Sequence, residues 1–322
     1  MRIWLTLLLA LLVLAGCGEP PPAALRVGVS PWVGYDPLVL ARDNRLLDAE
    51  RVRVIELGSS TECARALSNG TLDAAALSLD EALRLADEGA ALKIVAVLDV
   101  SRAAAAIVAG SGITSAAQLR GKRIALEQTA LGTLVLDRLL QAGGLQTSDV
   151  TLIQVEVTHH EAVLTDGRAD VVITFEPIRS RLLAHGHSEI LPSRPGQIDD
   201  VLVVSQRSWL AQRAQLRELL AGWEGSRRVL ADDPQSVAAL LAPATDLTPA
   251  QYLSALTGVS LQSLADSVRW LEGEPAPLAE HAAPLVHSLL RLGLIRSSPN
   301  WPVLLDGKLA SETHAIMAGR RK

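Results

Sequence analysis

Acidic and aromatic side chains follow several apolar runs of this sequence that are predicted to form β-strands. Trp32 and Tyr35 share one polar, glycine-containing loop, where they could stack on a planar or cationic group. The loops at the strand ends carry more acids than bases: the acids are Asp36, Asp80, Asp99, Glu127 and Glu176, and the bases are Arg102 and Arg179. Such loops would repel a bare anion, so a zwitterion, an amine or a neutral polar heterocycle is the better candidate ligand.

The common sequence signatures of covalent and metal chemistry are missing. The chain has no P-loop, no Gly-x-Ser-x-Gly elbow, no His-Glu-x-x-His pair and no Cys-x-x-Cys pair. The pair His159–His160 and the pair His185 and His187 are expected at the surface, with a metal site as the less favoured alternative. The paired acids Asp199–Asp200 are expected to be solvated turn or cap residues. We therefore expect no enzyme, no cofactor and no metal.

Short apolar runs alternate with capped helical stretches from Leu25 to about Gln206. Helix starts carry a hydroxyl residue followed three positions later by Glu or Gln, and helices end at glycine. This alternation predicts an α/β fold with largely parallel sheets covered by helices on both faces. The strand candidates are Leu25–Val29, Val52–Leu57, Leu72–Leu77, Leu92–Leu98, Ala104–Val108, Arg123–Leu126, Thr151–Glu156, Ala169–Thr174, Glu189–Leu191 and Val201–Val204.

Two stretches of the chain match at an offset of 97 residues: Leu67, Gly70 and Asp73 recur as Leu164, Gly167 and Asp170. The period is too long for a solenoid and occurs only twice, so it indicates two similar α/β lobes in tandem. After Ser208 only helices are predicted, and we expect them to pack on an earlier lobe.

Ligands of parallel α/β sheets lie beyond the carboxyl ends of the strands, where loops meet helix N-termini. Some residues there also have a purely structural interpretation, since Ser59, Thr129 and Thr158 are good helix N-caps with or without a ligand. The predicted ligand-binding residues are Trp32, Tyr35, Asp36, Ser59, Ser60, Ser78, Asp80, Asp99, Gln128, Thr129, Thr158, Phe175 and Glu176.

The composition is that of a folded, mildly acidic protein. Of 322 residues, 49% are hydrophobic, and 30 basic against 35 acidic side chains give a formal net charge of −5. Nucleic acid is a poor candidate partner because there is no basic cluster beyond Arg320–Lys322. A chain of this length exceeds the usual size of a single core, so two lobes or domains are expected.

The first residues are typical of an export signal. Arg2 precedes an apolar run from Ile3 to Ala15, which is too short to span a bilayer. The sequence Leu14-Ala15-Gly16-Cys17 resembles the bacterial lipobox, which implies cleavage after Gly16 and diacylation of Cys17. An ordinary cleaved signal peptide is the alternative. Residues 17–24 would form a proline-rich tether, and Cys63 would be a buried apolar residue without a disulfide partner.

Several motifs, taken in order, resemble one family. They are Val27-Gly-Val-Ser-Pro-Trp32-Val-Gly-Tyr35-Asp36-Pro-Leu38, Gly58-Ser-Ser60, Ala66-Leu67 to Ala74, Gly121-Lys-Arg-Ile124-Ala, and Gly167-Arg-Ala-Asp170 with Phe175-Glu176-Pro177. This order resembles the nitrate/sulfonate/taurine-type substrate-binding proteins of ABC importers, whose relatives take up pyrimidine precursors of thiamine. The chain departs from that pattern at Phe175, where Trp is common, and at Gln128–Gly132, which has no neighbouring basic residue.

The resemblance implies a two-lobed, type II-like periplasmic-binding-protein fold that closes over a small-molecule ligand. Lobe one would comprise residues 25–102 and 205–322, and lobe two residues 103–204. The partners would be an ABC permease with its ATPase, and the membrane through lipidated Cys17, for a monomer at the periplasmic or extracellular face. Two alternatives stay open: a sensory binding protein that reports to a membrane kinase or cyclase, and an enzyme on the same fold.

Overall fold

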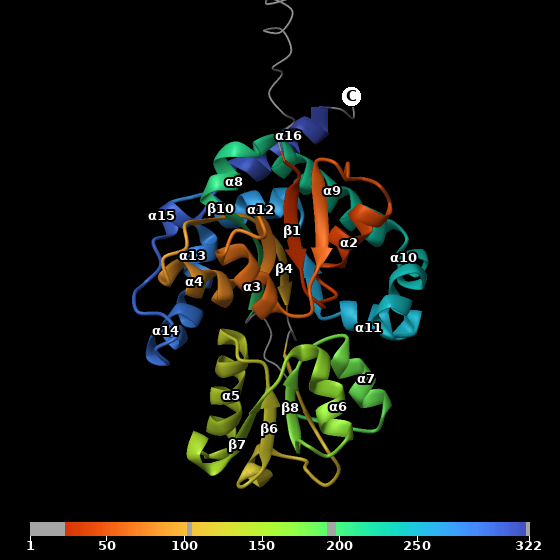
Figure 1. Cartoon of the computed structure of the whole chain (residues 1–322), viewed down its shortest axis with the longest axis vertical. Coiled ribbons are helices and arrows are strands. Elements are labelled where there is room, and N and C mark those ends of the chain that lie inside the picture. Colours follow the sequence, from red (N-terminus) through yellow and green to blue (C-terminus); the bar gives the residue numbers. More distant parts are fainter. Residues whose placement is uncertain (1–22, 102–104, 192–197, 320–322) are drawn as a thin grey trace, which may run out of the picture.

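The chain folds into two β-sheets, each flanked by helices, one above the other in Figure 1. The computed structural model describes residues 23–101, 105–191 and 198–319. Six strands form the first sheet in the order β11-β4-β10-β3-β1-β2, and five form the second in the order β7-β6-β8-β5-β9. The expected α/β fold is thus confirmed. We call the first sheet with the helices packed on it the first lobe, and residues 105–191 the second lobe.

Strand bounds follow the apolar runs closely. The first sheet contains β1 (Leu25–Val29), β2 (Val52–Glu56), β3 (Ala74–Ser78), β4 (Leu92–Ser101), β10 (Ile198–Ser205) and β11 (Val259–Leu261). The second sheet contains β5 (Ala106–Ala109), β6 (Arg123–Leu126), β7 (Thr151–Gln154), β8 (Val171–Thr174) and β9 (Ser188–Leu191).

Both sheets are mixed, rather than mostly parallel as the sequence pattern predicts. Strand β1 pairs in parallel with β2 and β3, and β6 with β7 and β8, but the ladders that involve β10 and β5 are antiparallel. The reason is the path of the chain. It leaves the first sheet after β4 and returns along the neighbouring β10, and it enters the second sheet on β5 and leaves from the neighbouring β9.

The expected boundary of lobe two therefore needs one correction. The prediction assigns residues up to Val204 to lobe two, whereas β10 lies between β4 and β3 in the first sheet. The part of the chain after Ser208 also contains one short strand, β11, in addition to its helices.

Helices cover both faces of each sheet. In the first lobe these are α2 (Asp36–Asp43), α3 (Ser60–Ser68), α4 (Leu79–Asp87), α8 (Gln206–Ala211), α9 (Arg213–Asp232), α10 (Pro234–Leu241), η4 (Ala242–Thr245), α11 (Pro249–Leu256), α12 (Leu264–Leu271), α13 (Pro277–His281), α14 (Ala283–Arg291), α15 (Trp301–Leu304) and α16 (Lys308–Gly319). In the second lobe they are η1 (Ala116–Leu119), α5 (Ala130–Gly143), η2 (Thr147–Asp149), η3 (Val157–His159), α6 (His160–Thr165) and α7 (Ile178–Ala184).

The core consists of four apolar clusters, one on each face of each sheet. On one face of the first sheet, Leu38 of α2 and Trp223 of α9 pack with Val27, and on the other face Cys63 of α3 packs with Leu77. The C-terminal helices thus pack on the first sheet, as expected. Burial raises the pKa of the Cys63 thiol to about 12, in keeping with its expected role as a small core residue.

The amino-terminal region falls mostly outside the described residues. The predicted signal and Cys17 lie there, as do residues 17–22 of the tether. Within the described ranges, no helix combines the length and the apolar character needed to cross a bilayer.

Candidate functional site

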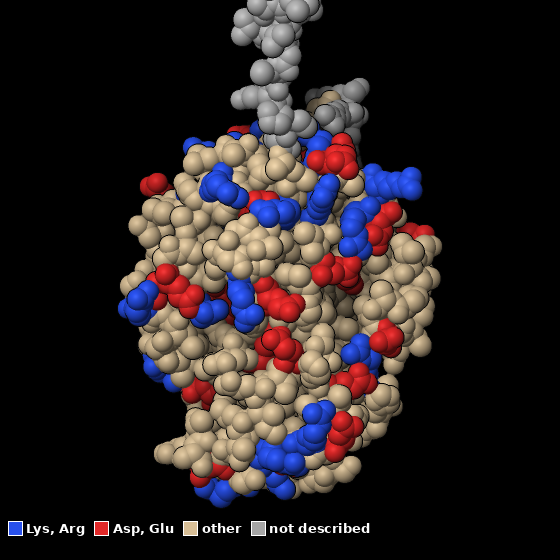
Figure 2. Space-filling view, in the orientation of Figure 1, with Lys and Arg blue, Asp and Glu red and all other residues tan. Residues whose placement is uncertain are grey.

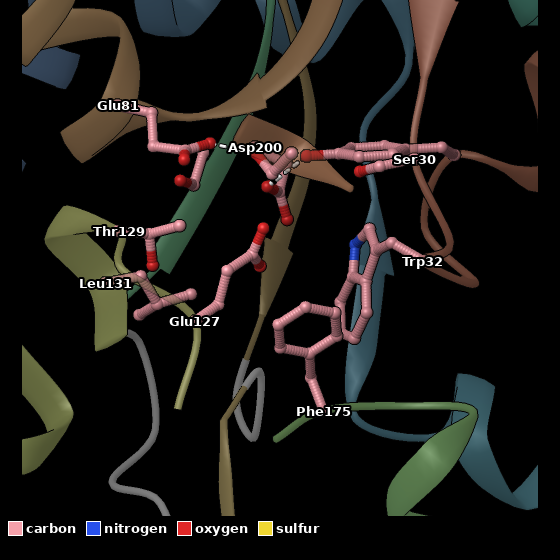
Figure 3. A pocket seen from close by; sticks show the side chains of 11 residues that line it. Ser30, Trp32, Glu81, Glu127, Thr129, Leu131, Phe175 and Asp200 are labelled. Atoms are coloured by element: carbon pink, nitrogen blue, oxygen red, sulfur yellow. Dashed lines mark hydrogen bonds between the residues drawn. The ribbon is translucent and has the colours of Figure 1, made fainter. Parts of the chain in front are cut away.

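A small cavity lies where the loops of the two lobes meet. It has a volume of about 40 Å³, which is room for about three water molecules at 10–15 Å³ each. Figure 3 shows Glu81, Glu127 and Asp200 around it, with Trp32 and Phe175 along one side. The lining residues are Ser30, Trp32, Tyr35, Ser60, Ser78, Glu81 and Asp200 from the first lobe, and Glu127, Thr129, Leu131 and Phe175 from the second.

Two carboxyl groups lie side by side on β4 and β10, next to the cavity. Asp99 of β4 and Asp200 of β10 are direct partners in the antiparallel ladder, and both are buried. The indole Nε1 of Trp32 donates to Asp99 Oδ2 at 3.0 Å, and the Tyr35 hydroxyl donates to Asp200 Oδ1 at 2.7 Å. Burial raises the pKa of Asp200 to about 7, and burial together with the Asp200 charge holds the pKa of Asp99 well above its usual range. The pair therefore retains a proton at neutral pH.

A second acidic pair begins helix α4. Asp80 and Glu81 are each 2% exposed, and Glu81 accepts a hydrogen bond from the Ser60 hydroxyl. Burial raises the pKa of Asp80 to about 6, and burial together with the neighbouring Asp80 raises that of Glu81 to about 8. Ionising both carboxyl groups of this pair is consequently unfavourable unless a positive charge binds beside them.

The second lobe adds one acid and one aromatic ring to the cavity. Glu127 follows β6 and accepts a hydrogen bond from the Thr61 hydroxyl of α3 at 3.0 Å, and burial raises its pKa. Phe175 follows β8 and meets Trp32 edge to face, with ring centroids 6.3 Å apart. Both contacts join the lobes across the cavity.

Two further contacts join the lobes on its flanks. Arg291 of α14 donates to Asp137 of α5 at 2.6 Å, and Arg181 of α7 donates to the Thr245 carbonyl at 2.9 Å. The lobes are thus held together around the cavity in this structure.

Basic side chains do not line the cavity among the described residues. Arg102 lies outside them, and Arg179 is bound to Glu176 and Glu189 at 3.0 and 2.8 Å. On the face shown in Figure 2, basic and acidic side chains are interspersed. The cavity is therefore acidic within a surface of mixed charge.

Most of the predicted site residues lie at or next to the cavity. Those that line it are Trp32, Tyr35, Ser60, Ser78, Thr129 and Phe175. Asp99 is hydrogen-bonded to the lining Trp32, and Asp80 neighbours the lining Glu81. Ser59 and Thr129 are helix N-caps, of α3 and α5.

Seven predicted site residues do not line the cavity: Ser59, Asp80 and Asp99, described above, and Asp36, Gln128, Thr158 and Glu176. Asp36 lies inside the first lobe, where it accepts a hydrogen bond from the Tyr252 hydroxyl at 2.6 Å and where burial raises its pKa to about 7. Glu176 is buried against Arg179 and the Ser180 amide in the first turn of α7. Gln128 and Thr158 are exposed. Thr158 is no N-cap either, because it lies inside the η3 turn that precedes α6.

Five lining residues are absent from the predicted list, namely Ser30, Glu81, Glu127, Leu131 and Asp200. The sequence pattern suggests a solvated turn for the Asp199–Asp200 pair, but the pair lies within β10 and is buried. An acidic pair directly before an apolar strand is the signal that could have found it. Glu81 directly follows the predicted Asp80 in helix α4, and position after a strand does not by itself distinguish the two acids.

One of the histidines expected at the surface is a core residue. His160 is fully buried, with Nδ1 3.1 Å from the Thr174 hydroxyl and Nε2 3.3 Å from the Val155 carbonyl. Burial lowers its pKa to about 4, so it is neutral at physiological pH. The described residues contain no group of three or more His, Cys, Asp or Glu side chains arranged to hold a metal ion.

Comparison with known proteins shows which family the sequence matches. A model of the NMT1-like family matches residues 18–243. A search of the curated proteins finds no match.

Solved structures share the fold at low sequence identity. The alkanesulfonate-binding protein SsuA from Xanthomonas axonopodis pv. citri, bound to MOPS, is 20% identical over 89% of this chain and 100% of its own, with a TM-score of 0.71. The periplasmic nitrate-binding protein NrtA from Synechocystis PCC 6803 is 15% identical over 93% of this chain and 90% of its own, with a TM-score of 0.71. DSZB, solved as a cysteine-to-serine mutant with biphenyl-2-sulfinic acid, is 15% identical over 91% and 99%, with a TM-score of 0.64. The expected type of fold is thereby confirmed.

Proposed function

We propose, from the premise that this chain belongs to the NMT1-like family, that it is an extracytoplasmic solute-binding protein. It captures a small polar organic ligand between its lobes and delivers it to an ABC permease with its ATPase. The observation that carries this proposal is the cavity itself, which both lobes line with hydrogen-bonding and aromatic side chains. The names of the structural neighbours, an alkanesulfonate-binding and a nitrate-binding protein, support the same role.

The lobes would act as two bodies that open and close. Each connection between the sheets is a single segment, after β4 and after β9. The contacts described across the cavity run through side chains, as in Trp32–Phe175 and Thr61–Glu127. Hinge closure of this kind is a common mode of ligand capture.

A binding role agrees better with the site than catalysis does. DSZB shares the fold, but Cys63, the cysteine among the described residues, lies in the core with a raised pKa and does not line the cavity. The proposal therefore assigns no catalytic residue.

The proposed anchor is a lipid on Cys17 after removal of residues 1–16, which would hold a monomer on a membrane at its periplasmic or extracellular face. Intact mass of protein extracted from membranes tests it. A mature chain that starts at Cys17 with added diacylglycerol supports it, and a different start or no added lipid mass contradicts it.

Native mass spectrometry of protein purified without added ligand tests the binding role. A co-purified small molecule is the expected result, and it should disappear after mild denaturation and refolding. Cross-linking in cells then identifies the membrane partner. Recovery of a permease supports transport, whereas recovery of a kinase or cyclase would contradict it in favour of a sensory role.

A further inference from the structure

We infer that the ligand is an organic cation, whose protonated nitrogen binds between Glu81, Asp200 and Glu127. Its binding displaces one proton from the acidic cluster, by which we mean these three residues with Asp80 and Asp99. This inference rests on the proposed solute-binding function and deepens it by naming the chemical class of the ligand. It also makes binding depend on pH.

Buried carboxylate oxygens without a hydrogen-bond partner point to a donor that the ligand must supply. Among them are Glu81 Oε1, Asp80 Oδ2 and Asp99 Oδ1, and these three residues are at most 2% exposed. Buried polar atoms in native proteins are nearly always paired, because each unpaired one costs about 1–3 kcal/mol. Glu81 lines the cavity, so its unpartnered oxygen marks a binding position.

Single hydroxyl groups of the protein donate to the three acids that line the cavity, and Glu81 Oε1 is left without a partner. Ser60 donates to Glu81, Thr61 to Glu127, and Tyr35 to Asp200. A hydroxyl donates a single hydrogen, whereas an ammonium group has three and an amidinium or guanidinium has a planar set. A nitrogen cation can therefore serve several carboxylates at once, which an anion cannot.

The titratable groups gathered around the cavity are almost all acids. They are Asp80 and Glu81 on α4, Asp99 on β4, Asp199 and Asp200 on β10, Glu127 after β6 and Glu156 after β7, with neutral Tyr35 in the loop after β1. The nearest described cations are already engaged, since Arg84 binds Glu88 at 2.5 Å and His281 Nε2 lies 3.3 Å from Asp199.

So many acids in one small volume cannot all be ionised, and the cluster keeps protons at neutral pH. A cation makes ionisation favourable, so a proton leaves when it binds. If one proton is exchanged per ligand, linkage weakens binding about tenfold per pH unit on the acidic side of the cluster's titration. Trp32 and Phe175 give the cation an aromatic wall.

Thermal melting of the mature protein with three matched probes tests the inference: benzylammonium, benzyl alcohol and benzoate at equal ionic strength. At pH 8, benzylammonium should raise the melting temperature, while the alcohol and benzoate should not. The apparent dissociation constant from a titration of this shift should rise at least tenfold between pH 7 and pH 5. Glu81→Gln should abolish the shift, and Glu280→Gln, an exposed acid on α13, should retain it.

Several results would overturn the inference. They are an equal shift in Glu81→Gln, a benzylammonium shift that does not vary with pH, or no benzylammonium shift at all. A shift by benzoate alone would overturn it while leaving solute binding intact. The proposed function fails separately, if no probe of any charge shifts the melting temperature and native mass spectrometry finds no co-purified molecule.

Discussion

The two lobes contain the same arginine–aspartate motif, but the motif is more deeply buried in the first lobe than in the second. In the first lobe, the backbone amide and Nε of Arg26 donate to Asp73, and Nη2 donates to the Gly70 carbonyl at 2.8 Å. In the second lobe, Arg123 makes the same bonds to Asp170 and to the Gly167 carbonyl, again at 2.8 Å. Each ties the start of a strand to the turn before a neighbouring strand. The sequence echo is therefore a structural repeat.

The difference lies in what covers the motif. The Asp73 side chain is 5% exposed and also accepts a hydrogen bond from Ser208 of α8 at 3.0 Å, whereas the Asp170 side chain is 26% exposed. The C-terminal helices belong to the first lobe alone. The first lobe is thus a larger platform that carries two of the three acids lining the cavity, and the second lobe is smaller.

The largest expected loss of stability comes from removing one of the two aromatic rings that meet across the cavity, Trp32 or Phe175. Trp32→Ala should lower the free energy of unfolding by about 3–5 kcal/mol, because Trp32 is 7% exposed within the first-lobe core and its loss leaves Asp99 without the indole donor. Phe175→Ala should cost clearly less, since Phe175 is only partly buried. Denaturant unfolding measures both, and equal losses would contradict the platform interpretation.

The paired motif gives the next effect. Asp73→Asn should cost about 1.5–3 kcal/mol, the usual range for hydrogen bonds to a charged group, and Asp170→Asn should cost less because water compensates there. Both aspartates have a lowered pKa, due mainly to the bonds from Arg26 and from Arg123. Their stabilisation is present above the normal pKa of about 3.8 and is lost as the pH falls below it. A larger loss for Asp170→Asn would refute the comparison.

Glu81 should behave in the opposite way. Its folded-state pKa is raised to about 8 from a normal 4.5, so its contribution is favourable at low pH and is lost as the pH rises from about 4.5 to about 8. Glu81→Gln should therefore stabilise the ligand-free protein at pH 8 by at least about 1 kcal/mol, since one pKa unit corresponds to about 1.4 kcal/mol, and not at pH 4. Melting curves across this range check it. Destabilisation at both pH values would show that Glu81 is a structural residue.

The smallest effects concern the two flanking contacts between the lobes. Arg181→Ala should cost at most about 1 kcal/mol, because Arg181 is 20% exposed and bound to both Glu161 and the Thr245 carbonyl. Arg291→Ala should leave the melting temperature unchanged, since its ion pair with Asp137 is solvent-exposed. A strong effect of Arg291→Ala would mean that lobe contacts contribute to stability beyond the two cores.

Local signals were sufficient for much of the fold. Apolar runs located β1 and β6, the Ser59 cap located α3, and the echo of Asp73 in Asp170 indicated two related lobes, because each depends only on residues near in sequence. The same holds for Trp32 and Tyr35, whose place after a strand brought them to the cavity. All of these predictions depend on local features: the spacing of apolar residues, helix capping and the composition of loops.

Tertiary structure alone decided the direction of β10 and the surroundings of the acids. Asp200 meets Asp99 only because the chain returns beside β4 after building the second sheet, a contact between residues 101 positions apart. Asp36 is likewise bound by Tyr252 from 216 positions away, whereas Glu176 is bound by Arg179, only three positions further along the chain. Whether a carboxylate is solvated or buried depends on which distant elements cover it. The residues next to it in sequence do not determine that packing.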